Sequence, residues 1–217
     1  MRAHSQVAGC TGRIRRMNIE LLPTLIENHV ETPGIHADRW IEELPRLVVH
    51  CCSRWSLSPP GTPFPDAQYN YVAPSARNGK PVVLKIVASK RDFDRECRAL
   101  TCYKGDGSVG VISFDESIRA LLLERIQPGN PLADIRSDDE ATRIAARLMT
   151  RLWRRVTRPD DFDSVAEWAF RRADLPIAAI NSRIPIAMMD RAVGLFRELT
   201  RMPSDEVLAH GDLDDDR

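Results

Sequence analysis

The dipeptide Asn78-Gly79 constrains the fold most, because it separates two runs of strand-forming residues. Residues 69–73 (Tyr-Asn-Tyr-Val-Ala) and residues 81–87 (Pro-Val-Val-Leu-Lys-Ile-Val) are rich in β-branched and aromatic side chains. Asn-Gly accepts the positive φ angles of the tight turns that join antiparallel strands. We therefore expect a β-hairpin here, within an antiparallel sheet.

Helical patterns lie on both sides of this hairpin. Apolar residues recur at helical spacing over residues 40–55, which predicts a helix that is kinked or restarted at Pro45. The four prolines of residues 58–65 predict an irregular loop between this helix and the hairpin. A second helix is expected after the hairpin, with Asp92 as its N-cap and its apolar residues on adjoining faces.

The chain changes character at Pro128-Gly129-Asn130-Pro131. Two strands are expected before this phrase, at residues 109–112 and 120–124, and helices follow it. A capping box at Ser137 and Glu140 predicts the first helix. Further helices are expected at residues 164–171 and from Pro185 onward, the last one burying Met188, Ala192, Leu195, Phe196 and Leu199. We expect an α+β chain with a lobe of helix and sheet at residues 17–124 and a helical lobe at residues 125–217.

Composition excludes several classes of protein. Lys+Arg and Asp+Glu both number 31, so no excess positive charge is present to bind nucleic acid. No apolar run approaches the roughly 20 residues that span a bilayer. The five cysteines lack the spacing of a zinc or redox motif, which indicates reduced thiols in a cytoplasmic protein. Residues 1–16 have no apolar signal region, and we expect a disordered leader or a start codon placed before Met17.

Lys85 and Glu96 are candidate binding residues because of their order along the chain. Lys85 lies inside an otherwise apolar strand, and Glu96 lies on the helix expected after it. Taken singly, such a lysine is more often a surface charge, and such a glutamate is about as often a solvated acid on a helix face. Together, a strand lysine and a glutamate on the next helix match the ion pair that holds the α and β phosphates of ATP.

Two further phrases have both a functional and a structural interpretation. Residues 121–126 end the strand-rich half, and the backbone groups exposed at the end of such a strand can bond an adenine edge. A plain buried strand explains the same run. His210-Gly211-Asp212 follows a short apolar run at residues 207–209, expected to be a buried strand, and such an aspartate holds a substrate hydroxyl in line with a phosphate. A simple turn with Asp212 as a cap is the structural alternative.

The order of all these elements is more specific than any one of them. The elements follow one another as in a two-lobed kinase. Their order is a hairpin, the strand with Lys85, the helix with Glu96, a strand ending at Glu124, a helical segment and then His210-Gly211-Asp212. The chain resembles the aminoglycoside and hydroxyurea resistance kinase family, which includes streptomycin 6-phosphotransferases. The resemblance covers about residues 17–213, and its phrases are residues 69–74, 81–86, 120–125 with Pro128-Gly129, and 207–213.

This resemblance implies a protein-kinase-like fold, with an antiparallel sheet in the N-terminal lobe and an incomplete helical C-terminal lobe. It implies ATP and Mg²⁺ as cofactors, and transfer of the γ-phosphoryl group to a hydroxyl of a small molecule such as streptomycin or another aminoglycoside, or hydroxyurea. Residues 69–72, with Asn70, would replace a glycine-rich loop over the phosphates. Lys85 would hold the phosphates, Glu96 would orient Lys85, and Asp212 would be the catalytic base. The backbone near Glu124 and Ile126 would receive adenine.

The end of the chain departs from the family pattern. In the family an asparagine stands five residues after the catalytic aspartate, and here that position is Arg217. A later strand aspartate that binds Mg²⁺ has no counterpart before the chain ends. We therefore expect a C-terminally truncated chain with an incomplete metal site and impaired activity. The alternatives are a non-catalytic nucleotide-binding pseudokinase and a non-functional fragment. The sequence carries no indication of oligomeric state.

Overall fold

The computed structural model describes residues 21–23, 25, 37–156, 158, 161–167, 186–201 and 206–210. The described residues fall into two compact units, one that reaches Leu152 and one that starts at Trp153. The lobe boundary that we expect near Arg125 stays a prediction.

A four-stranded antiparallel sheet forms the centre of the first unit. The strands are β1 (Tyr71–Arg77), β2 (Lys80–Ile86), β3 (Val111–Asp115) and β4 (Ala120–Glu124), in the spatial order β1-β2-β4-β3. Arg77 pairs with Lys80, so Asn78 and Gly79 form a two-residue turn. Their φ angles of 52° and 77° are those that a tight hairpin turn requires. The expected hairpin is therefore confirmed, and the chain is α+β.

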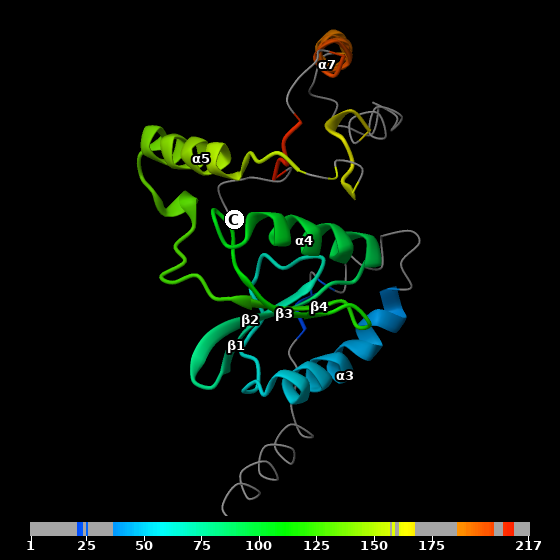
Figure 1. Ribbon diagram of the computed structural model, residues 1–217, viewed down its shortest axis with the longest axis vertical. Helices are drawn as coiled ribbons and strands as arrows, with labels where there is room; N and C mark the ends of the chain where they lie inside the picture. The colour runs from blue at the N-terminus through cyan, green and yellow to red at the C-terminus, as the bar shows by residue number, and fades with distance from the viewer. Residues whose placement is uncertain are drawn as a thin grey trace, which may run out of the picture. The chain divides into compact units, whose positions relative to one another are not determined.

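Two helices cover the opposite faces of this sheet, α3 (Ala37–Trp55) and α4 (Lys90–Tyr103) (Figure 1). The larger apolar cluster includes side chains from α3 and one face of the sheet, among them Trp40, Leu44, Leu84 and Leu122. α3 runs without interruption through Pro45, so the helix is not restarted there. Buried side chains before and after Pro45 pack into one cluster, and this packing outweighs the one backbone hydrogen bond that proline removes.

The N-cap of α4 is Ser89, and the prediction of Asp92 as the cap was wrong. The Asp92 N–H donates to Ser89 Oγ at 3.3 Å, and the Phe93 N–H donates to Ser89 O at 3.0 Å. Asp92 lies in the first helical turn, where its negative charge interacts favourably with the helix dipole. The sequence contains two good capping residues here, Ser89 and Asp92, and the earlier one begins the helix.

The helix α5 (Asp138–Leu152) completes the first unit, after a short 3₁₀ turn, η1 (Leu132–Asp134). The Glu140 N–H donates to Ser137 Oγ at 3.4 Å, which confirms the expected cap. The end of α5 lies against the turn that follows α4. Arg151 forms an ion pair with Asp106, and a Cβ added to Gly107 would lie 3.1 Å from Leu152 Cδ2.

The second unit contains α7 (Ile186–Leu199) and an isolated β-bridge between Arg154 and Leu208. The helix is confirmed within the described residues, but its expected burial is wrong. Met188, Leu195, Phe196 and Leu199 are 65, 48, 40 and 62% exposed, and Ala192 is exposed as well. The cause is that helical periodicity identifies an apolar face without supplying what covers it.

The remaining predictions for this unit are met only in part. Leu208 is buried, but the strand expected at residues 207–209 is a single bridge, and Val207 is 41% exposed. Residues 165–167 are helical, and the rest of the helix expected up to residue 171 lies outside the described residues, as does Pro185. No helix in the described part of the chain is both long and apolar enough to cross a membrane.

Candidate nucleotide-binding site

Lys85 and Glu96 form the predicted ion pair. Lys85 Nζ donates to Glu96 Oε1 at 2.6 Å, and the two side chains keep 21% and 26% of their exposure. Lys85 projects from the sheet face that α4 covers, because its neighbours Leu84 and Ile86 belong to the cluster on the α3 face. An ammonium and a carboxylate therefore meet between a strand and a helix while both remain partly exposed.

The local sequence explains why Glu96 lies opposite Lys85. Phe93 and Leu100 on α4 pack with Leu121 and Leu123 of β4 in a second, smaller apolar cluster. Glu96 is three residues after Phe93 and four before Leu100, so it lies on the same face of α4 as these two residues, the face that packs on the sheet. A partly exposed ion pair stabilises a protein by only about 0–1 kcal/mol. The pair therefore matters more for where it holds a positive charge than for the stability of the fold.

Asn70 lies just before β1 and bonds to the backbone. The Ala88 N–H donates to Asn70 Oδ1 at 3.2 Å. In the preceding turn, the Ala67 N–H donates to Phe64 O at 3.1 Å, and the Tyr69 side chain, directly before Asn70, is 56% exposed. Asn70 thus connects this turn to the chain that leaves β2.

The proline-rich loop is more ordered than the sequence indicated. Three of its N–H groups donate to carbonyls of β1: Ser58 to Ala76 at 2.8 Å, Gly61 to Pro74 at 2.8 Å and Phe64 to Val72 at 2.9 Å. The segment therefore lies along the outer edge of β1, with prolines at positions that need no donor. Residues 65–70 form the turn between this segment and β1.

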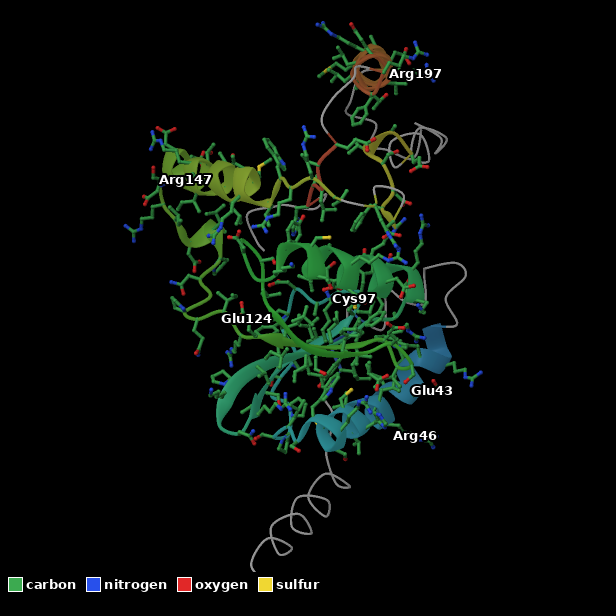
Figure 2. All side chains as sticks on the ribbon, viewed as in Figure 1. Glu43, Arg46, Cys97, Glu124, Arg147 and Arg197 are labelled. Carbon is green, nitrogen blue, oxygen red and sulfur yellow. The ribbon has the colours of Figure 1, made fainter. Side chains whose placement is uncertain are left out.

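Glu124 and Ile126 lie at and beyond the end of β4. Leu121 and Leu122 are fully buried, whereas Glu124 is exposed and Ile126 is 53% exposed. The Glu124 N–H donates to Gly110 O at 3.0 Å. Leu121 of β4 pairs with Lys85 of β2. Glu124, the last residue of β4, is therefore three residues along the strand from the partner of Lys85. Figure 2 labels Glu124 at this end of the sheet.

Cys97 is the neighbour of Glu96 on α4 and is also labelled in Figure 2. Burial, and to a smaller extent the negative charge of Glu96, raises the pKa of its thiol to about 11. Cys97 is therefore protonated at neutral pH and is a poor nucleophile. It packs against the smaller apolar cluster.

The structure also shows contacts that the sequence did not indicate. Arg119 lies in the turn between β3 and β4 with a φ of 53°. Its Nε donates to Val87 O at 3.0 Å, and the Val87 N–H donates to Arg119 O at 2.9 Å. The only local signal was the charged, glycine-free turn itself, and that pattern does not identify a partner 32 residues away.

Part of the expected site lies outside the described residues. Asp212 and Arg217 are among these positions, and His210, which is described, is exposed. In the described part of the chain, no group of three or more His, Cys, Asp or Glu side chains is arranged to hold a metal ion.

Comparisons with known proteins identify the family of the chain. The sequence profile of the aminoglycoside/hydroxyurea antibiotic resistance kinases matches residues 54–217. The chain belongs to this family. It is 30% identical over 193 residues to a streptomycin 6-kinase of Streptomyces griseus, an alignment that covers 87% of the chain and 62% of that protein.

Two further relatives are a streptomycin 6-kinase of Streptomyces glaucescens and a hydroxyurea phosphotransferase of Kitasatospora aureofaciens, both 28% identical. Each alignment covers 62% of the chain, and they cover 44% and 40% of these two relatives. The chain thus spans less than two thirds of the length of the relatives that it matches. No solved structure matches the chain.

Proposed function

We propose that this chain is part of an ATP-dependent phosphotransferase with a protein-kinase-like fold. The reaction would transfer the γ-phosphoryl group of ATP to a hydroxyl of a small molecule, an aminoglycoside such as streptomycin or hydroxyurea. The observation that carries the proposal is the accessible Lys85–Glu96 ion pair between β2 and α4. A family relationship to streptomycin and hydroxyurea kinases supports the choice of acceptors.

In this proposal each residue of the site has one task. The Lys85 ammonium neutralises charge on the α and β phosphates, and Glu96 holds it in place by the 2.6 Å contact. Residues 69–72 cover the phosphates, and the backbone near Glu124 and Ile126 bonds adenine. Asp212 accepts the proton of the acceptor hydroxyl when that oxygen attacks the γ-phosphorus and the bond to the bridging oxygen of ADP breaks.

Mg²⁺ is the metal that the family implies beside ATP. It would neutralise phosphate charge during transfer. The described residues include no cluster of potential ligands, so they do not form a site that fits the ion, and we assign no ligand and no step to it.

The proposed setting is the cytoplasm, where ATP is available. Cys51, Cys52, Cys97 and Cys102 form no disulfide, as is usual in a reducing compartment. The partner would be a small-molecule acceptor, with no role in nucleic-acid binding, since the chain has no net charge.

ATP binding to the full chain tests the proposal. We expect Lys85→Met to raise the ATP dissociation constant by about tenfold or more, since it removes a charge-assisted contact to phosphate. The matched control is Lys80→Met, which removes an exposed lysine from the first position of the same strand and should leave the dissociation constant within about twofold. Equal ATP affinities of the wild-type and Lys85→Met chains would overturn the proposed site.

Phosphoryl transfer is a separate measurement. The chain is incubated with labelled ATP, Mg²⁺ and either streptomycin or hydroxyurea, and Asp212→Asn is the control. Transfer that Asp212→Asn abolishes supports the full proposal. ATP binding without transfer would instead support the alternative, a non-catalytic nucleotide-binding module.

A further inference from the structure

A three-residue connection joins the strand of Lys85 to the helix of Glu96. We call residues 87–89 the β2–α4 junction. Val87 is fully buried and Ala88 is 9% exposed. Ser89 begins α4 as its N-cap. Buried backbone groups need hydrogen-bond partners, so the contacts of this junction decide where it can lie.

Two residues from distant parts of the chain supply those partners. Asn70 Oδ1 accepts from the Ala88 N–H at 3.2 Å, across 18 residues of sequence. Arg119 Nε donates to Val87 O at 3.0 Å, and Arg119 O accepts from the Val87 N–H at 2.9 Å. Because only the amide oxygen of asparagine can accept from an N–H, the Ala88 contact also determines how the Asn70 amide is oriented.

The backbone of Arg119 supports this interpretation. Its φ of 53° is unfavourable for a residue with a side chain, and such a conformation persists where surrounding contacts hold it. Arg119 bonds Val87 both through its backbone carbonyl and through its guanidinium.

The junction determines how β2 and α4 lie relative to each other. Lys85 is two residues before Val87, and Glu96 is seven residues, about two helical turns, after Ser89. A shift of the junction would move the ammonium and the carboxylate apart. The Asn70 contact also connects the turn of residues 65–70 to the same point, so one amide joins the turn, the strand and the helix.

We propose that Asn70 and Arg119 clamp the β2–α4 junction and thereby position Lys85 against Glu96. Asn70 then acts on phosphate binding through the Ala88 backbone and does not itself contact the nucleotide. It is a positioning residue, and this inference rests on the proposed function. It also explains how residues 69–72, the glycine-free segment proposed to cover the phosphates, are held in place through Asn70.

The test combines amide hydrogen exchange with ligand binding, both on the full chain. Without nucleotide, we expect Asn70→Ala to speed exchange of the Ala88 amide by about tenfold or more, because a buried hydrogen bond is lost. Asn70→Asp keeps an oxygen acceptor and should restore slow exchange. Asn130→Ala is the matched control, since it removes an exposed asparagine after β4 and should not change exchange at Ala88.

Binding of ATP and of adenosine then separates positioning from a general loss of structure. We expect Asn70→Ala to weaken ATP binding by about five- to tenfold and to leave adenosine binding within about twofold, because only ATP has phosphates for Lys85 to hold. Asn70→Asp should keep ATP affinity within about threefold of wild type. If Asn70 contacted phosphate, the new carboxylate would repel ATP.

Three results would overturn the inference. The first is unchanged exchange at Ala88 in Asn70→Ala. The second is an equal loss of ATP and adenosine binding, which would show a general structural role. The third is loss of ATP binding by Asn70→Asp with Ala88 still protected, which would show direct contact. A wild-type chain that does not bind ATP would instead refute the proposed function, and exchange at Ala88 would still show whether Asn70 makes the contact.

Discussion

Arg54 and Asp115 join the last turn of α3 to the end of β3. Arg54 Nε lies 3.0 Å from Asp115 Oδ2, and the Asp115 side chain keeps only 10% of its exposure. Asp115 Oδ1 accepts from the Ser117 hydroxyl at 2.6 Å and from the Ser117 N–H at 3.0 Å. The Asp115 carboxylate thus orders the turn between β3 and β4 and also attaches the end of β3 to the last turn of α3.

This arrangement predicts an acid-dependent loss of stability. The Ser117 hydroxyl lowers the pKa of Asp115, and the Ser117 N–H, Arg54 and His50 lower it further. Because the folded pKa is the lower one, the stabilisation is fully present above the pKa of a free aspartate, about 3.9, and is lost as the pH falls through the folded value. Asp115→Asn should reduce the free energy of unfolding at pH 7 by about 1–2 kcal/mol.

Urea unfolding of wild type and Asp115→Asn between pH 7 and pH 3 checks this prediction. The difference between the two proteins should shrink toward low pH, where the wild-type carboxylate also becomes protonated. Asp138→Asn, at an exposed position at the start of α5, is a control that should show a much smaller difference. A difference for Asp115→Asn that is constant from pH 7 to pH 3 would contradict the assignment.

The end of α5 lies so close to the turn after α4 that we expect a side chain at position 107 to destabilise the fold. The φ of Gly107 is 84°, and an added Cβ would lie 3.1 Å from Leu152 Cδ2. Gly107→Ala should cost about 2–3 kcal/mol, because backbone strain and crowding add. Gly79→Ala is the matched control. Its φ is 77° with nothing within 4 Å of the new Cβ, so it should cost only about 1–2 kcal/mol of strain.

Unfolding free energies of both variants separate these two terms. The excess cost of Gly107→Ala over Gly79→Ala measures the contact with Leu152. Equal costs would mean that Leu152 moves away freely and that the end of α5 is not held against this turn.

The first half of the fold was largely predictable, because its signals are local. Asn78-Gly79 specifies a hairpin by backbone geometry, and the pairing of Lys85 with Glu96 was predicted from the order of a strand and the helix that follows it. Ser89 was missed as the cap because Asp92 satisfies the same local preference. Asn70 and Arg119 could not be paired with the β2–α4 junction, since their contacts depend on how distant segments fold together.

The second half was less predictable for a different reason. The spacing of apolar residues predicts which face of α7 contains Met188 and Leu199. Whether this face is buried depends on which other segments pack against it, and both residues are exposed. Asp212 as catalytic base and the metal site stay predictions, because the positions that would decide them lie outside the described residues. The family resemblance, by contrast, is confirmed, because it depends on the order of several phrases rather than on any one contact.

Cys97 should react slowly in the folded chain. Burial and then Glu96 raise its pKa to about 11, so the thiolate is scarce at pH 8. Iodoacetamide should modify Cys97 about a hundredfold more slowly in the folded than in the urea-unfolded chain, as measured by mass spectrometry. Glu96→Gln should speed the folded reaction by removing a negative charge. A folded rate equal to the unfolded one would contradict the partial burial of this thiol.

The Lys85–Glu96 pair should behave as one unit in nucleotide binding. Lys85→Met removes the charge that attracts phosphate, and Glu96→Gln removes the carboxylate that orients it, so we expect the second change to weaken ATP binding by about three- to tenfold. In the double variant, the loss should be no larger than in Lys85→Met, because Glu96 has nothing left to orient. Calorimetric titration of ATP into the four proteins measures this coupling. If the two losses multiply in the double variant, Glu96 acts on the nucleotide independently of Lys85, and the orienting role assigned to it is wrong.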